Sequence, residues 1–297
     1  MLSDTIIILH IPATHDQAYL VSIPRDTQAD IPPYPKSKFQ GTNTKINAAF
    51  SYGYQAEGSE QEKRGHGMSL LSATLNKLTG IRFNGAALID FNGFEKIIDA
   101  LDGVHMCVDE EAESIHIGVN KDGHPYKGWY NENGPQPRLE GLPAGYKPFV
   151  HKVGCRDMTG TMALDYARIR KSLSDGDYGR QRHQQQLIKA IAKKAASSGV
   201  LTDLGKVSAL MDAAGEALIL DTQNVDLADF VFTLKGVAAN DLMLIKTNAG
   251  QFHSEVDAQG GSIETLDAES LDMLSAAKDG TLGTFLIEHP QFIAKSQ

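Results

Sequence analysis

The apolar and polar positions of the N-terminal part of the chain alternate between short β-rich runs and longer helical runs. Residues 5–11 and 18–23 are rich in β-branched side chains and flank a polar turn that contains a proline, which predicts a hairpin or two neighbouring strands. Apolar residues at helical spacing predict helices at 45–52 and 68–78. Gly80 is expected to cap the second of these helices.

A strand–helix–strand alternation follows, with a strand at 86–90, a helix at 91–101 and a strand at 104–108. Such alternation predicts an α/β fold, in which a mixed β-sheet is flanked by helices. Polar residues with Gly, Pro and Asn then fill residues 109–145. Loops of that length are uncommon in compact domains, so this stretch is expected to be a functional or mobile loop.

Strong helices are predicted at 158–168 and 180–198, on either side of an acidic turn marked by glycines. The weaker pattern of the C-terminal third predicts helices at 201–214, 225–237, 271–277 and 281–288 and a strand at 242–247. The sequence contains no internal repeat and no clear linker. We therefore expect a single domain over residues 1–297.

Composition and charge reduce the number of function classes that fit the chain. The chain has 297 residues, ordinary globular hydrophobicity and a net charge of −9. This charge argues against a protein that coats nucleic acid, which neutralises phosphates over a broad surface, so an anionic ligand would need a local basic cluster. The longest apolar run, 6–9, is too short to cross a bilayer, and no signal peptide precedes it. Taken alone, these features suggest a cytoplasmic protein.

Cysteine and histidine give no sign of a metal site. By spacing alone, Cys107 and Cys155 are more typical of two unrelated buried thiols than of a disulfide. The sequence has no CxxC motif, no Cys/His cluster with zinc spacing and no closely spaced histidine pair.

Arginine recurs around the acidic turn, at Arg168, Arg170, Arg180 and Arg182. Its planar guanidinium can bind two phosphate oxygens at once, which lysine cannot do. If residues 166–170 are extended, Arg168 and Arg170 share one face; if these residues end a helix, the two side chains diverge. In the second case they could simply complement the helix dipole.

Arg180 is expected to begin the helix that follows the turn, where a cation is unfavourable unless an anion binds there as well. Gln184 lies one turn later and would share the face of Arg180. Arg182 is expected to be an exposed residue outside the site. The arginines therefore favour a diphosphate site over a solvated helix surface.

Arg25 follows a proline at the end of the strand predicted at 18–23, so it would lie at the edge of the sheet, where α/β proteins commonly bind ligands. The tripeptide alone favours a surface turn made with Asp26, and both interpretations remain open. A carboxylate among arginines and a diphosphate, such as Asp4 or Asp26, would suit Mg²⁺. Lys45 alone carries no functional signal.

Together, these segments resemble the LytR–CpsA–Psr family of cell-envelope proteins. The resemblance covers residues 3 to about 195 and rests on the runs Ser3–Thr5, Val21–Thr27, Lys45–Ala49, Asp90–Phe94, Leu101–Val104, Ala163–Arg170 and Gly176–Gln181. It implies an α/β core at 3–195 with a hydrophobic pocket for a polyprenyl chain, followed by an extension at 200–297. Family members have an N-terminal membrane anchor and an earlier aspartate, so the resemblance implies an anchor outside this chain and a soluble chain that acts on the extracytoplasmic face of the membrane.

The resemblance also implies an activity and a set of site residues. The activity is Mg²⁺-dependent transfer of a glycopolymer from a polyprenyl-diphosphate carrier to peptidoglycan, through a phosphodiester bond. Asp4 would bind Mg²⁺, and Asp26 would be a base or would orient its neighbours. His183 stands where the family often has another arginine, so no contact is expected there. The diphosphate would lie on Arg25, Lys45, Arg168, Arg170, Arg180 and Gln184.

Cys107 and Cys155 stand where some actinobacterial relatives carry a cysteine pair, so the resemblance is to the actinobacterial type and implies a disulfide outside the membrane, which would close the base of the 109–145 loop. The alternatives to a transferase are a polyprenyl-diphosphate pyrophosphatase and a catalytically weak lipid-binding module. A transcriptional regulator is disfavoured by the net charge and by the absence of a helix-turn-helix signature.

Overall fold

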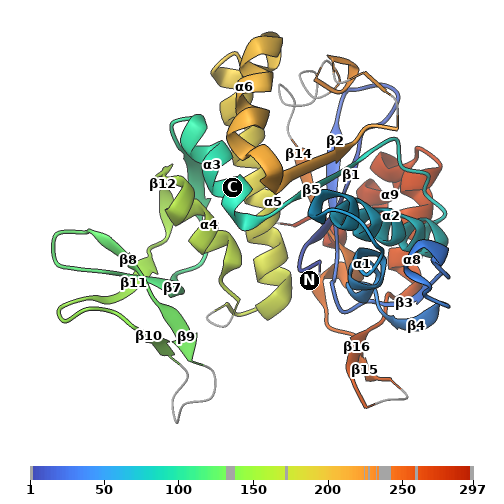
Figure 1. Cartoon of the computed structure of the whole chain (residues 1–297), viewed down its shortest axis with the longest axis horizontal. Coiled ribbons are helices and arrows are strands. Elements are labelled where there is room, and N and C mark those ends of the chain that lie inside the picture. The colour runs from blue at the N-terminus through green and yellow to red at the C-terminus, as the bar shows by residue number, and fades with distance from the viewer. Residues whose placement is uncertain are drawn as a thin grey trace.

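The computed structural model describes residues 3–131, 138–170, 173–223, 225–226, 228–231, 233, 242–257 and 260–294. Its helices are α1 (Ala48–Tyr54), α2 (Glu60–Thr79), α3 (Phe91–Ala100), α4 (Gly160–Arg168), α5 (Gly176–Ser197), α6 (Leu204–Ala214), α8 (Ala268–Lys278) and α9 (Leu282–Glu288). Its strands are β1 (Ile6–His10), β2 (Ala18–Ile23), β3 (Gln28–Ile31), β4 (Thr42–Lys45), β5 (Ala86–Ile89), β6 (Val104–Val108), β7 (Ala112–Val119), β8 (Pro125–Lys127), β9 (Trp129–Asn131), β10 (Arg138–Glu140), β11 (Lys147–His151), β12 (Gly154–Met158), β13 (Leu218–Asp221), β14 (Leu242–Lys246), β15 (Ser254–Val256) and β16 (Ser262–Glu264). The α/β class is confirmed (Figure 1).

A three-stranded mixed sheet lies at the centre, in the order β1–β2–β14. β1 and β2 form the predicted antiparallel hairpin, whereas β14 runs parallel to β2. The apolar residues of α2, α8 and α9 share one buried cluster with the sheet, and α5 packs against β2 and β14 through another. Gln185 fixes α5 to the sheet, because its Nε2 donates to the carbonyls of Leu20 and Ile245 at 2.8 Å. Figure 1 shows α5 on one side of the sheet and α2, α8 and α9 on the other.

Two N-terminal helices differ from prediction. α2 begins at Glu60, well before the apolar periodicity, because Ser59 and Glu62 form a capping box. It ends as predicted at Gly80, whose φ of 70° suits glycine. The helix predicted from Lys45 begins only at Ala48, and Lys45 instead closes β4.

The prediction of a long loop at 109–145 is wrong. Within the described residues, this stretch contains β7, β8, β9 and β10, and β7 pairs with β8 and with β11. Three of these strands have three residues each and are bounded by turn residues, which gave a loop-like composition. Figure 1 shows these strands projecting from the body of the molecule at the end where α5 begins.

A buried polar network joins this sheet to α4. The Asp165 carboxylate is only 3% exposed. It accepts a hydrogen bond from Ser114 Oγ at 2.8 Å and lies 2.7 Å from His151 Nε2. Buried polar groups are stable only when they are paired, so this network fixes the helix that ends at Arg168.

The remaining predictions are largely confirmed, with shifted boundaries at α3, α4, α6, α8 and α9. Most of the helix predicted at 225–237 lies outside the described residues. In the described ranges, each helix is too short or too polar to span a lipid bilayer.

Candidate functional site

Arg25 lies in a turn directly after the central strand β2. Pro24 follows the last residue of the strand, and the Thr27 N–H closes the turn by donating to the Pro24 carbonyl at 3.0 Å. The Arg25 side chain is only 24% exposed. The turn places its guanidinium at the end of the sheet, as predicted, but partly buried rather than on the open surface.

The Arg25 guanidinium faces carboxylates that come from different segments. Its Nη1 donates to Asp4 Oδ1 at 2.5 Å, and its Nε lies 3.8 Å from Asp26 Oδ2. Lys45 Nζ lies 3.1 Å from the other oxygen of Asp26. Burial acts to lower the pKa of Arg25, but the hydrogen bond to Asp4 and the nearby carboxylates raise it by more. Arg25, Lys45, Asp4 and Asp26 are therefore brought together as predicted.

Arg180 does not begin its helix. α5 starts at Gly176, so Arg180 lies on the second turn, and the prediction that it marks an anion-binding helix end is wrong. Its side chain is nevertheless 11% exposed, with Nη2 2.8 Å from Asp177 Oδ1 and 3.2 Å from the Asp4 carbonyl oxygen. Burial lowers the pKa of Arg180, and the positive charges of Arg25 and Arg170 lower it further against the effect of Asp177.

Arg168 and Arg170 leave the end of α4 on an extended segment. Arg168 is the last helical residue, and Ile169 between the two arginines is extended and fully buried. The Arg168 guanidinium lies over the Phe91 ring, 4.3 Å from its centroid, and burial lowers its pKa. Arg168 interacts electrostatically with Asp4, and Arg170 with Arg180. Both arginines therefore belong to one cluster with Arg25 and Arg180, which we call the arginine cluster.

Some polar atoms at the arginine cluster are buried without a partner. Within the described ranges, Arg25 Nε, Arg180 Nε and Gln184 Oε1 have no hydrogen-bond partner. A guanidinium keeps its charge in a protein, and burial lowers the pKa of Arg180 in spite of the carboxylates around it. The two unpartnered Nε–H donors favour an anion that can accept hydrogen bonds from several arginines at once, whereas Gln184 Oε1 is an acceptor and does not add to this argument.

Mg²⁺ would fit this site only together with a phosphate ligand. Asp4 offers one half-exposed carboxylate, and Asp177 is the further carboxylate that interacts with both Arg25 and Arg180. In the described part of the chain, no set of three closely spaced His, Cys, Asp or Glu ligand atoms includes Asp4. Mg²⁺ is commonly held by one or two carboxylates plus substrate phosphates, so Asp4 suits a metal that arrives with the diphosphate.

Arg182 belongs to a separate network and is not the exposed residue that the sequence predicted. Its side chain is 16% exposed, with Nε 2.7 Å from Asp109 Oδ2 and a further ion pair to Asp175. His183 is fully buried, stacks on Tyr166 at 3.9 Å and lies 3.1 Å from Asp109 Oδ1. Arg182 and His183 therefore hold α5 in place through Asp109.

Asp109 carries no recognisable signal in the sequence, because one acidic residue after a strand is ordinary. Asp177 lies three residues before Arg180 on one helix, and this spacing is the signal that indicates their ion pair.

Two cavities border the start of α5. One, of about 400 Å³, is lined by residues that include Asp26, Arg170 and Asp177; the other, of about 270 Å³, adjoins Asp109 and Arg182. Both are lined by charged and polar side chains as well as apolar ones, so neither is the apolar pocket expected for a prenyl chain, which stays a prediction.

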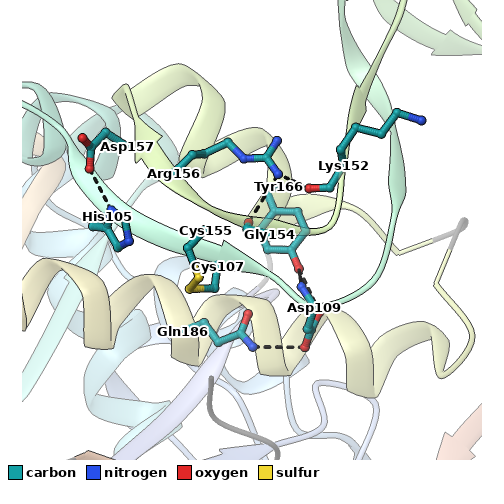
Figure 2. Close-up of a disulfide and its surroundings, with 10 residues drawn as sticks. All are labelled: His105, Cys107, Asp109, Lys152, Gly154, Cys155, Arg156, Asp157, Tyr166 and Gln186. Carbon is teal, nitrogen blue, oxygen red and sulfur yellow. Dashed lines mark hydrogen bonds and ion pairs between the residues drawn. A yellow bond between two sulfur atoms is a disulfide. The ribbon is translucent and has the colours of Figure 1, made fainter.

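A disulfide joins Cys107 to Cys155 (Figure 2). The two cysteines face each other across the antiparallel pair β6–β12. Strand β6 leads to Asp109, and β12 leads into α4 and its terminal Arg168. The disulfide implied by the resemblance is confirmed, and it closes the base of the segment that contains β7–β11.

The sequence profile of the LytR_cpsA_psr family matches residues 2–278. The chain belongs to the LytR–CpsA–Psr family. One curated relative is a polyisoprenyl-teichoic acid–peptidoglycan teichoic acid transferase, TagU of Halalkalibacterium halodurans, 28% identical over 84% of this chain and 64% of the relative. Another is the cell wall biosynthesis protein LcpA of Corynebacterium glutamicum, 26% identical over 91% of this chain and 47% of the relative. The chain thus spans about half to two thirds of the length of these relatives.

Solved structures of similar proteins share the fold. Bacillus subtilis TagV has a TM-score of 0.61 at 18% identity, with 95% of this chain and 90% of TagV covered. TagT bound to LIIa-WTA has a TM-score of 0.64 at 21% identity, with 95% of this chain and 86% of TagT covered. At these identities the comparison shows that the α/β architecture is that of the family.

Proposed function

We propose that the protein transfers a glycopolymer from a polyprenyl-diphosphate carrier to a sugar hydroxyl of peptidoglycan. The observation that carries the proposal is the arginine cluster, where partly buried guanidinium groups converge with unpartnered donors. The relative TagU is named as a teichoic acid transferase and LcpA as a cell wall biosynthesis protein, which supports a transferase that acts in cell wall assembly. Membership of a cell-envelope family supports a place of action outside the membrane.

The arginine cluster suits the diphosphate of a lipid carrier. Arg168 stacks on Phe91, which is 39% exposed although it is a large apolar residue. An exposed aromatic ring beside a guanidinium matches the junction between a prenyl chain and its diphosphate. Arg25, Arg170, Arg180, Lys45 and Gln184 would then hold the phosphate oxygens.

The proposed reaction balances as a phosphoryl transfer. The acceptor hydroxyl oxygen forms a bond to the phosphorus that carries the glycopolymer, and the bond from that phosphorus to the bridging oxygen breaks. The hydroxyl proton goes to Asp26, and polyprenyl phosphate leaves. Arg25 and Arg180 stabilise the charge that develops on the leaving phosphate. Mg²⁺, when bound at Asp4, adds to this neutralisation.

The test is a transfer reaction with Mg²⁺, a labelled polyprenyl-diphosphate saccharide and peptidoglycan. We expect label in the peptidoglycan with the unaltered protein, and loss of both transfer and lipid binding with Arg168→Ala. Absence of transfer, together with undiminished lipid binding by Arg168→Ala, would refute the proposal. Release of polyprenyl phosphate without an acceptor would point to a pyrophosphatase instead.

A further inference from the structure

The cavity of about 400 Å³ borders the arginine cluster at Asp26 and Arg170. Its walls come from the start of α5, the turn after β2 and the β15–β16 hairpin. We propose that this cavity, which we call the acceptor cavity, binds the uncharged, hydroxyl-rich sugar that accepts the phosphoryl group. This inference rests on the proposed function and names the place of its second substrate.

The charges around the acceptor cavity argue against an anionic occupant. Three carboxylates, Asp26, Asp177 and Glu264, line it together with one guanidinium, that of Arg170. A diphosphate in the cavity would lie directly against these three carboxylates, and a prenyl chain would desolvate them at a cost. Sugar hydroxyls can donate to carboxylates without adding charge.

An exposed aromatic ring at the cavity suits the apolar face of a sugar. Phe252 lines the cavity and is 54% exposed, which is unusual for a large apolar side chain. Its ring stands edge-on to that of Tyr178, with 5.0 Å between the centroids and 61° between the planes. Phe252 therefore offers an exposed ring that is supported from one side by Tyr178.

One hydrogen-bond acceptor in the cavity wall, on Gln181, has no donor among the described residues. Gln181 is 6% exposed, and its Nε2 donates to Asp177 Oδ2 at 3.1 Å. Its Oε1 is buried and has no hydrogen-bond partner among the described residues. Ser262 adds an exposed hydroxyl to the lining. Ligand sites of this kind combine an apolar surface with a few polar groups that fix orientation.

Glu264 makes the far wall rigid and connects it to the arginine cluster. Its carboxylate, 5% exposed, accepts hydrogen bonds from Tyr178 Oη at 3.0 Å and from the His253 N–H at 2.9 Å. The Glu264 N–H donates to the Asp26 carbonyl at 2.9 Å. Asp26 lines the cavity and also lies beside Arg25. A sugar in the cavity would thus place a hydroxyl beside Asp26, close to the arginine cluster.

The first test measures binding of a chitin tetrasaccharide to the purified protein by isothermal titration calorimetry. We expect Phe252→Ala to weaken binding by about 2- to 10-fold, in line with the value of a stacked aromatic contact, and Phe252→Trp to retain it. Val256→Ala is the matched control, because Val256 lies on the same hairpin, is 72% exposed and does not line the cavity. Equal affinity for Phe252→Ala and the unaltered protein, or no binding by the unaltered protein, would overturn the proposal.

The second test separates this proposal from the proposed function. In the transfer reaction, Phe252→Ala should raise the KM for the acceptor while leaving lipid-diphosphate affinity unchanged. If the unaltered protein transfers and the acceptor KM of Phe252→Ala does not move, the acceptor cavity is wrong and the transferase stands. If the saccharide binds through Phe252 and no transfer occurs, the transferase is wrong and the saccharide site stands.

Discussion

Arginine chemistry at this site depends on burial as much as on residue type. Arg138 on β10 is 71% exposed and pairs with Glu140, whereas Arg180 is 11% exposed and keeps an unpartnered Nε. An exposed arginine is compensated by water, but a buried one needs an acceptor. The same side chain is therefore a solvated charge at one position and a candidate anion-binding group at the other.

Replacement of Arg180 should weaken lipid-diphosphate binding selectively. We expect Arg180→Gln to reduce affinity about 10- to 100-fold, because a hydrogen bond to a charged group is worth about 1.5–3 kcal/mol. The measurement is titration with a soluble short-chain prenyl diphosphate. Arg138→Gln should bind like the unaltered protein, and an equal loss in both variants would contradict the assignment.

Asp109 should contribute stability that depends on pH. Burial raises the pKa of its carboxyl, but His183 and Arg182 lower it by more, so the folded pKa lies well below its ordinary value of 3.8. A carboxyl with a depressed folded pKa stabilises the fold above its ordinary pKa, and this contribution is lost as the pH falls through the folded value. Asp109→Asn should therefore lower the free energy of unfolding by about 3 kcal/mol near neutral pH, and by less below about pH 4.

Urea unfolding at several pH values checks this expectation. Asp157→Asn is the control, because Asp157 is 91% exposed and pairs only with an exposed histidine in the described structure. A destabilisation by Asp109→Asn that stays constant across the acid range would show that the carboxylate charge is not its cause.

At the scale of elements, the antiparallel pair β6–β12 controls the geometry of the site. β6 leads to Asp109, which pairs with Arg182 of α5, and β12 leads into α4, which ends at Arg168. The disulfide joins the two strands at facing positions, and Asp165 anchors α4 to Ser114 and His151 of the neighbouring sheet. The elements that carry arginines are thus fixed by groups that are not themselves part of the arginine cluster.

Loss of the disulfide should destabilise the fold more than the site. The bond closes a loop of 48 residues, for which the chain-entropy treatment gives about 4 kcal/mol. We expect the Cys107→Ser/Cys155→Ser variant to unfold at lower urea concentration, with prenyl-diphosphate affinity nearly unchanged while it remains folded. The unaltered protein under reducing conditions should match the variant, and identical midpoints for all three samples would contradict the expectation.

At the scale of the whole molecule, residues remote in sequence complete the central sheet. β14 lies beside β2, and the buried Met273, Leu274, Leu282 and Phe292 share one core cluster with the hairpin β1–β2. The C-terminal part therefore covers the sheet that displays Arg25. Stability of the first part of the chain should depend on it, because a hairpin alone buries too little surface.

A chain that ends at residue 223 should fail to fold. It would lack β14, α8 and α9 and would leave one edge and one face of the sheet open. Circular dichroism with urea should show no cooperative transition, whereas the full chain should unfold cooperatively. A cooperative transition in the truncated chain would show that the first part of the chain folds without β14, α8 and α9.

Local sequence patterns were enough to predict the α/β class, neighbouring strands at β1–β2, the helix α3 and a group of arginines that the structure brings close together. These features depend on local periodicity, turn residues and residue chemistry, which a single sequence displays directly. The sequence placed the start of α5 too late and began a helix at Lys45, which instead closes β4, because strand pairing and tertiary packing shift element boundaries. The strands at 112–140 were missed because short strands bounded by turn residues have the composition of a loop.

Which charged groups are buried, and which partners they pair with, depends on the tertiary fold. Arg180 and Arg182 are two residues apart on one helix, yet one turns to Asp4 and Asp177 and the other to Asp109 and Asp175. The acceptor cavity is equally invisible in sequence, since Phe252 and Glu264 reach Asp26 and Gln181 through folding alone. Burial and long-range pairing depend on the path of the whole chain, which local patterns do not specify.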